Sequence, residues 1–387
     1  MNSEHSHVFP QFKMARSDVK PQKGDTTLQK VDVAFYLADD APSDPVSSNE
    51  PRWHTMQIPV EFKGSTLKDP FDDNLAADAP QGSAMERQAS QGQMISYASQ
   101  VFQYQHRVFL FSVIIMRNFA RIIRWDRSGT VFTERFDYLK NPERLGVFFW
   151  RYSLASAEQR GFDRTAVLVS PGSLDYQLMD RVASDDERLE FRDYAREKFK
   201  ESLAHPFFGR WKLSIVQKLP EGANGPEEVK YYLVGAPFFQ ATGTAGRGTR
   251  VFVAVVCGPA ETSKRFVCLK DAWRVDHDGI DPEGDILATL NTLGISNVPT
   301  LLNHGDVGEQ HTMTDRLYKE LCPDATLSDS PYRSHTHYRM AVDEVCLPLS
   351  EFKNGRELVE LIRDCFIGEP SFGVCNVPIL ISISYST

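Results

Sequence analysis

Residues 242–274 read TGTAGRGTRVFVAVVCGPAETSKRFVCLKDAWR, and the rest of the chain is interpreted outward from this stretch. It opens with three glycines, Gly243, Gly246 and Gly248, which lead into an alternating apolar run at residues 249–256. Glycine is needed where backbone N–H groups approach an anion or where the chain takes a positive φ. The apolar run has the period of two that predicts a β-strand.

A second strand follows and ends on Lys270, whose ammonium group is a point charge able to reach a phosphate. Asp281-Pro282-Glu283 then has the composition of a helix start, with Asp281 as the N-cap and Pro282 at the first position. Gly294 marks the end of that helix.

A glycine loop, two strands, a lysine and a helix with an early glutamate follow one another in the order found in the N-terminal lobe of a protein kinase. Each piece alone has a simpler explanation. Glycine clusters are more often turns, Lys270 alone fits a solvated strand end, and Glu283 alone is a carboxylate favoured by the helix dipole. Their order and spacing together favour nucleotide binding.

Three segments make the resemblance specific: GRGTR at 246–250, LKDAWR at 269–274 and HTHYRMAVDEV at 335–345. They resemble the fungal-type protein kinase family, a divergent group of basidiomycete kinase-like proteins. Residues 97–139 are similar to the domain that precedes the kinase lobe in that family, and the resemblance covers about residues 94–368.

The resemblance implies ATP as the ligand. Lys270 would contact the α- and β-phosphates, Glu283 would pair with Lys270, and the two glycines of GRGTR would let backbone amides approach the phosphates. Residues 343–345 would form the hinge whose backbone groups bind adenine. The nucleotide contacts implied in this way are Gly246, Gly248, Lys270, Glu283, Glu344 and Val345.

Phosphoryl transfer also needs a carboxylate that orients the hydroxyl group, and Asp or Asn ligands for Mg²⁺. In the family these groups follow the helix after the hinge, which is predicted here at residues 355–367. Residues 368–387, GEPSFGVCNVPILISISYST, contain no HRD motif and no aspartate. The expectation is therefore a chain truncated before its catalytic loop, with no catalytic residue, no Mg²⁺ held by its own ligands, and nucleotide binding at most.

Three other interpretations stay open. The chain could be a pseudokinase-like scaffold that needs no nucleotide and binds a protein through the apolar face that an incomplete lobe exposes. It could also be a non-functional gene fragment. His335 and His337 lie on one strand face as a candidate metal pair, but no third ligand is assignable, which favours structural histidines.

Arg124, Trp125, Asp126 and Arg127 invite a functional interpretation as well, because tryptophan and arginine together can bind nucleotides or peptides. A strand that ends in a turn begun by Asp126, with Trp125 in the core, explains the same residues more simply.

The composition of the chain limits the kinds of partner it is expected to bind and the cellular compartment in which it is expected to occur. The net charge is −9 and no long basic run occurs, so a nucleic-acid partner is not expected. The six cysteines are dispersed, which is typical of a reducing compartment. The N-terminus has no signal-peptide pattern, and the longest apolar runs, 108–116 and 377–385, are too short to span a membrane. An intracellular protein, cytoplasmic or nuclear, is expected.

Local patterns predict several further elements. Residues 31–37 and 53–62 have strand character, and residues 83–105 carry apolar side chains at helical spacing. Ser184-Asp185-Asp186-Glu187 has the capping-box pattern and predicts a helix to about residue 204.

The predicted fold class is α+β: an upstream mixed domain, then a kinase-like N-lobe with a twisted, mostly antiparallel sheet and a helix, and little of a C-lobe. The predicted divisions are a largely disordered region at 1–83, a family-specific α+β domain at 84–205, the kinase-like N-lobe to the hinge and first C-lobe helix at 206–368, and a divergent tail at 369–387.

Overall fold

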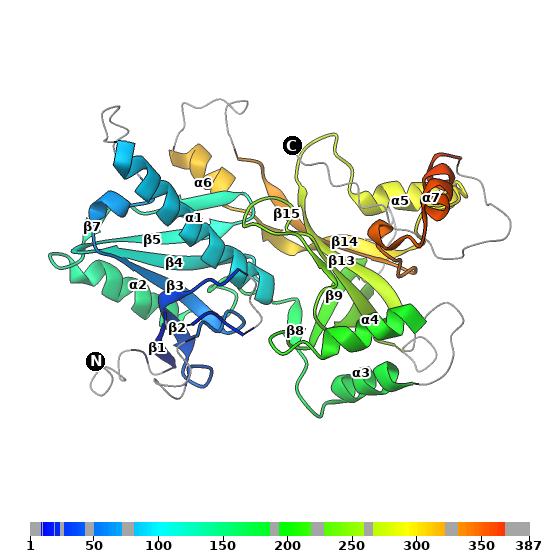
Figure 1. Ribbon diagram of the computed structural model, residues 1–387, viewed down its shortest axis with the longest axis horizontal. Coiled ribbons are helices and arrows are strands. Elements are labelled where there is room, and N and C mark those ends of the chain that lie inside the picture. The colour runs from blue at the N-terminus through cyan, green and yellow to red at the C-terminus, as the bar shows by residue number, and fades with distance from the viewer. Residues whose placement is uncertain are drawn as a thin grey trace. The chain divides into compact units, whose positions relative to one another are not determined.

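The structure is a computed structural model in which the chain forms two compact units (Figure 1). The first unit comprises residues 1–164, 242–248 and 311–335, and the second unit comprises residues 165–241, 249–310 and 336–387. The residues that the structure describes are 9, 11–18, 20–23, 27–42, 50–71, 81–185, 193–217, 228–258, 266–321 and 332–367, so the predicted tail at 369–387 lies outside them.

The first unit is built on a mixed sheet of seven strands with the order β1-β2-β3-β4-β5-β6, in which β7 also pairs with β5. Only β3 and β4 pair in parallel among the described strands, and parallel neighbours need a crossover connection. The strands are β1 (Phe12–Ser17), β2 (Val31–Leu37), β3 (Met56–Lys63), β4 (Phe109–Met116), β5 (Phe119–Asp126), β6 (Gly129–Phe132) and β7 (Phe136–Asp137).

Two helices cover the two faces of this sheet (Figure 1). The crossover helix α1 (Gln81–Tyr104) packs Tyr97 and Phe102 against Ile114 of β4. Helix α2 (Pro142–Leu154) packs against Val113, the neighbouring residue of β4 whose side chain points to the opposite face. Successive apolar side chains of β4 therefore pack alternately into the core under α1 and the core under α2.

The expectation that residues 1–83 are largely disordered is wrong for the three segments that form β1, β2 and β3. Val31, Tyr36 and Trp53 are fully buried against α1 and β4. The Pro-, Ser- and Asp-rich composition suggested disorder, but pairing with a strand about fifty residues later in the chain buries these side chains. Composition does not report such long-range pairing.

The second unit is built on an antiparallel sheet with the order β14-β15-β13-β12-β10-β9-β8, in which β11 also pairs with β12. Its strands are β8 (Ala166–Leu168), β9 (Trp211–Gln217), β10 (Glu228–Val234), β11 (Phe239–Gln240), β12 (Arg250–Val256), β13 (Phe266–Val275), β14 (Leu301–His311) and β15 (His335–Val342). Its helices are α3 (Leu174–Ser184), α4 (Asp193–Leu203), α5 (Glu283–Thr292) and α7 (Gly355–Ile367).

Helices α3, α4 and α5 pack on the same face of this sheet. Phe199 of α4 shares an apolar cluster with Val253, and Leu287 of α5 shares another with Cys268. Val253 and Cys268 are direct partners in the register of β12 and β13, so both clusters lie on one face. This packing assigns α3 and α4 to the second unit. The units therefore part after residue 164 rather than at the predicted boundary of 205/206.

The sheet of the second unit curls until strands near its two ends approach each other. A Cβ on Gly305 of β14 would lie 2.5 Å from the carbonyl oxygen of Val216 on β9, so only glycine fits there. Tyr232 of β10 is hydrogen-bonded to Asn303 of β14. The curl closes an apolar interior between these strands.

The α+β class is confirmed, with one mixed sheet, one antiparallel sheet and seven α-helices among the described residues, the remaining helix being α6 (Thr314–Leu321). In the part of the chain that the structure describes, no helix combines the length and the apolar character needed to cross a membrane.

Candidate functional site

Lys270 and Glu283 form an ion pair in the second unit. The Nζ atom of Lys270 on β13 lies 2.8 Å from Oε1 and 2.6 Å from Oε2 of Glu283 at the start of α5. The Lys270 side chain is 14% exposed and that of Glu283 is 42% exposed, so the pair is fixed by the fold and still reachable from solvent. The pairing expected from the sequence is therefore present.

The first turn of α5 sets the position of Glu283. The helix begins at Glu283, with Pro282 in the cap position and no side chain capping it, so the prediction of Asp281 as N-cap is wrong. Pro282 has extended backbone angles (φ −56°, ψ 139°), which start the helix one residue later than predicted. The C-terminal end of the helix is where the sequence predicted it, because Gly294 follows the C-cap residue Leu293 with a φ of +68°.

A close contact at Gly284 brings α5 onto the sheet. The backbone N–H of Gly284 donates to the Tyr338 hydroxyl at 2.9 Å. A Cβ on Gly284 would lie 2.2 Å from Cγ of His304 and 2.4 Å from the Tyr338 hydroxyl oxygen. Any side chain there would push the helix away from β14 and β15, and Glu283 with it.

The predicted hinge leaves the strand next to the one that carries Lys270, since β15 and β13 are neighbours in the sheet. Glu344 is tied to Thr300, whose Oγ1 and N donate to its two carboxylate oxygens at 2.6 and 2.7 Å. Val345 packs against the apolar cluster that contains Cys268, two residues before Lys270 on β13. A role of Glu344 and Val345 in adenine binding would rest on their backbone groups and stays a prediction.

The motifs LKDAWR and HTHYRM meet in a buried cluster around Asp271. The Asp271 carboxylate is 1% exposed and accepts from Arg250 Nη2 at 2.7 Å, His337 Nε2 at 2.5 Å and Arg339 Nε at 3.3 Å. Burial alone would raise the pKa of Asp271, but His337, Arg339 and Arg250 hold that pKa well below its usual range. Trp273 stacks on the His337 ring with centroids 4.8 Å apart.

His337 serves this cluster with both ring nitrogens, because Nδ1 also lies 2.6 Å from Oε1 of Gln310. This favours the structural interpretation of the histidine pair over a metal site. Among the described residues, no group of three or more His, Cys, Asp or Glu side chains is arranged to hold a metal ion.

Gly246 and Gly248 belong to the first unit, whereas Lys270, Glu283 and residues 343–345 belong to the second. Both glycines adopt positive φ angles, +91° and +48°, as the glycine cluster predicted. The N–H of Gly246 donates to the carbonyl oxygen of Arg127 at 2.8 Å. Arg127 follows β5, so the glycine loop is bound to a turn that the sequence did not connect with it.

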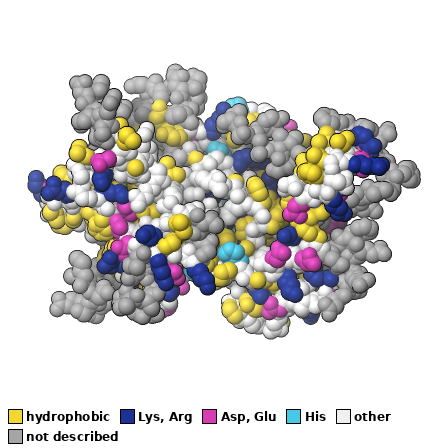
Figure 2. Space-filling view, in the orientation of Figure 1, with side chains coloured by type: hydrophobic (Ala, Val, Ile, Leu, Met, Phe, Trp, Pro, Cys, Tyr) yellow, Lys and Arg dark blue, Asp and Glu magenta, His cyan; other side chains and the backbone are white. Residues whose placement is uncertain are grey.

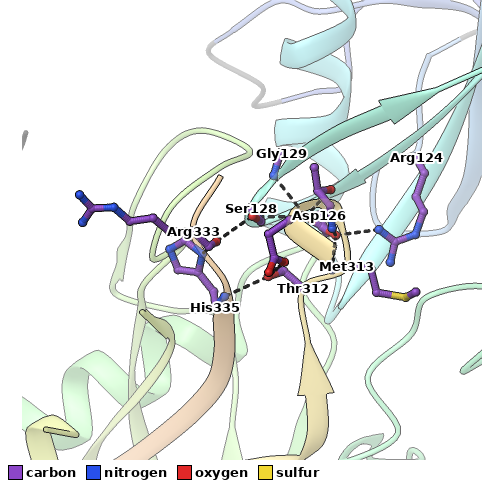
Figure 3. Close-up of polar contacts among 10 residues, drawn as sticks. Arg124, Asp126, Ser128, Gly129, Thr312, Met313, Arg333 and His335 are labelled. Carbon is purple, nitrogen blue, oxygen red and sulfur yellow. Dashed lines mark hydrogen bonds and ion pairs between the residues drawn. The ribbon is translucent and has the colours of Figure 1, made fainter. Parts of the chain in front are cut away.

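The same turn also binds residues 313 and 314, at the start of α6, and Arg333, just before β15 (Figure 3). The Asp126 carboxylate accepts from Met313 N at 2.8 Å and Thr314 N at 3.1 Å, at the start of α6. Burial raises the pKa of Asp126, but Arg124 at 2.7 Å and the Met313 amide lower it by more, and the net shift is downward. Ser128 Oγ donates to the Arg333 carbonyl oxygen at 2.7 Å, near the other end of the segment.

Comparison with protein families now decides the assignment. A sequence model of the family described as fungal protein kinase matches residues 30–372, which is most of the chain. The chain belongs to the fungal protein kinase family. No curated protein and no solved structure gives a significant match.

The match to the fungal protein kinase family covers more residues than the resemblance carried by the motifs. The family match begins at residue 30, so it includes β2 and β3, whereas the motif resemblance began near residue 94. Sequence reasoning also missed Asp271 and Arg127 as organising residues. Each lies inside a motif that was noticed, but the partners of each are separated from it by tens of residues or more.

Proposed function

We propose that the second unit is the nucleotide-binding lobe of a fungal-type protein kinase and that it binds ATP. The Lys270–Glu283 ion pair is the observation that carries the proposal. Protein kinases use a strand lysine paired with a glutamate of the following helix to hold the α- and β-phosphates. The proposal concerns nucleotide binding and assigns no catalytic residue and no Mg²⁺ ligand.

The position of the pair in the sheet supports this proposal. Kinases carry the lysine on their third strand. In the sheet, β13 lies beside β12 and β12 lies beside β10, so Lys270 is on the third strand when the count starts at β10 and leaves out the short β11. Glu283 holds the ammonium group of Lys270 through both carboxylate oxygens, so the positive charge needs little reorganisation before a phosphate binds.

ATP is expected to raise the thermal unfolding midpoint of the full chain, because a ligand that binds only the folded state stabilises it by mass action. At an ATP concentration 100 times Kd the stabilisation is about 2.7 kcal/mol. The measurement is a thermal melt with ATP, with adenosine and with tripolyphosphate. The two fragments are expected to give smaller shifts than ATP, because each fills part of the site.

A second candidate function is a protein-binding scaffold that needs no nucleotide. Apolar side chains are exposed on α5, on the segment after it and on α7, where hydrophobic and basic groups lie together at the upper right of Figure 2. They are Ile286, Leu293, Ile295, Val359 and Ile362. A folded chain whose midpoint does not move at millimolar ATP would favour the scaffold and contradict the nucleotide site.

A further inference from the structure

We propose that helix α2 and the sheet beside it form a docking groove for an acidic amphipathic helix of a partner protein. The groove lies wholly within the first unit, so it is separate from the proposed nucleotide site and needs no nucleotide. Three observations carry it: two hollows beside α2, a stripe of exposed apolar side chains on α2, and two arginines that form no ion pair with a described residue.

The smaller of the two hollows has an aromatic lining. It measures about 330 Å³ and is lined by Phe111 of β4 and by Phe148 and Tyr152 of α2. The ring centroid of Phe111 lies 5.5 Å from that of Phe148 and 6.2 Å from that of Tyr152, and both pairs meet edge to face. Phe111 and Phe148 are only half-buried, so apolar surface remains in the hollow for a partner to cover.

The larger hollow, of about 610 Å³, continues the groove toward the start of α2. Arg144 and Val147 line both hollows, so the two meet at these side chains. Val147 is also the first of three exposed apolar residues on α2, at 41% exposure, and Trp150 and Leu154 follow at 48% and 67%. Intervals of three and four residues place the three in one stripe along the helix, which is the spacing at which helices pack on one another.

Two arginines supply the charge that selects an acidic partner. Arg144 and Arg151 line the smaller hollow, and no acidic side chain is among the described residues that line it with them. Arg144 lies over the ring of Phe136, with Cζ 5.5 Å from the centroid. Because the two arginines are seven positions apart, they lie on one side of α2, about 10 Å apart along its axis. A partner helix with acidic residues seven positions apart has the same repeat and matches both.

The charges of the groove also argue against two other occupants. A symmetric pair of α2 helices would bring the arginine-lined side of one copy against the same side of the other, and like charges repel. Glu134 and Glu143 line the larger hollow beside Arg144, and they would repel an anionic lipid surface. A peptide helix can instead place a basic residue opposite these glutamates and acidic residues opposite the arginines.

A phage-displayed library of amphipathic helices, selected on the full chain, tests the groove. The library has a fixed stripe of leucines and random residues beside it. Selected peptides are expected to carry Asp or Glu at two positions seven apart. They should bind Arg144→Glu/Arg151→Glu about tenfold more weakly, because two exposed ion pairs become two repulsions. Changing the two acidic residues of the peptide to lysine should restore binding to this variant to within about threefold of the original Kd.

The matched control is Lys200→Glu/Lys353→Glu, which makes the same change in net charge at two exposed lysines of the second unit. Its Kd for the selected peptides is expected to stay within about twofold of wild type, because salt screens charges outside the groove. If the charge reversal of the groove lowers the thermal unfolding midpoint, Arg144→Gln/Arg151→Gln replaces it. Glutamine removes the charge without adding repulsion, so a loss of about fivefold is then expected.

Four results would overturn the docking groove. Selection could yield no peptide, or peptides without acidic residues seven positions apart. Equal binding to wild type and to the groove variant would place the peptides elsewhere on the chain. A dimer in light scattering that is lost in Trp150→Ser would assign this face to a second copy. Binding to vesicles of phosphatidylcholine and phosphatidylserine that is lost in the same variant would assign it to a membrane.

Discussion

Replacing Asp271 with alanine is expected to lower the free energy of unfolding by about 3–5 kcal/mol, which is the usual result of removing one partner from a buried ion pair. Asp271 and Arg339 are almost fully buried, at 1% and 0% side-chain exposure, and Arg250 is 8% exposed. The substitution leaves two guanidinium groups inside the second unit without their carboxylate. Urea denaturation of the two proteins at neutral pH measures the difference.

Asp306→Ala is the matched control for Asp271→Ala. Asp306 accepts from Arg274 at 2.7 and 2.8 Å in the same sheet, but both side chains are about one-fifth exposed. Solvent therefore screens the pair, and its loss should cost about 1 kcal/mol or less. If both substitutions lowered the free energy of unfolding by the same amount, the Asp271 cluster would contribute no more to stability than the partly exposed pair.

The Asp271 effect is also expected to depend on pH. The folded-state pKa lies well below the unfolded value of about 3.9, so the carboxylate contributes stability above that value. The contribution is lost as the pH falls through the folded-state pKa. The difference in free energy of unfolding between wild type and Asp271→Asn should shrink as the pH falls below about 4.

Replacing Lys270 with methionine is expected to weaken ATP binding by about 10- to 100-fold while leaving the fold intact. Methionine keeps the unbranched, mostly buried stem of the side chain and removes the charge. A hydrogen bond to a charged group contributes about 1.5–3 kcal/mol, which corresponds to that range of Kd. Calorimetric titration with ATP measures the change directly.

Two further variants show whether the Lys270 effect is specific. Lys230→Met removes an exposed lysine of the same sheet, on β10, and should leave the Kd unchanged. Glu283→Gln keeps the shape of the partner and removes its charge, so Lys270 is held less firmly and an intermediate loss is expected. A Lys270→Met protein that binds ATP like wild type would contradict the site.

Local patterns in the sequence predicted the elements whose signals are local. The strand at residues 31–37 is observed with the same bounds, and the helix predicted at 83–105 is observed as α1 at Gln81–Tyr104. The pairing of Lys270 with Glu283 also followed from order and spacing, because the two residues are only 13 positions apart. Such features depend on periodicity, capping residues and short connections.

The capping-box pattern at residues 184–187 predicted the wrong N-cap. Ser184 looked like the N-cap of a helix, but it is the last residue of α3, whose N-cap is Ser173. Ser173 Oγ accepts from Tyr176 N at 3.2 Å, and Met179 and Val182 of the helix are buried on the sheet. Packing of that apolar face outweighed the capping pattern at the other end.

The contacts that organise the candidate site could not be predicted from the sequence, because they join residues that are far apart in the chain. Arg127 meets Gly243 across 116 positions, and Asp271 meets His337 across 66. The parallel pairing of β3 with β4 likewise depends on a crossover of more than forty residues. Composition and periodicity describe one segment at a time and carry no information about which segments meet.

The most direct test of the central claim is labelling with an acyl-phosphate analogue of ATP. The amine of a lysine beside the bound phosphates attacks the acyl carbonyl, an amide forms, and the nucleotide leaves with the bond electrons. Mass spectrometry of the labelled chain is expected to find the acyl group on Lys270, with labelling blocked by excess ATP. A folded chain in which Lys270 stays unlabelled, or is labelled equally with and without ATP, would contradict a nucleotide site at the Lys270–Glu283 pair.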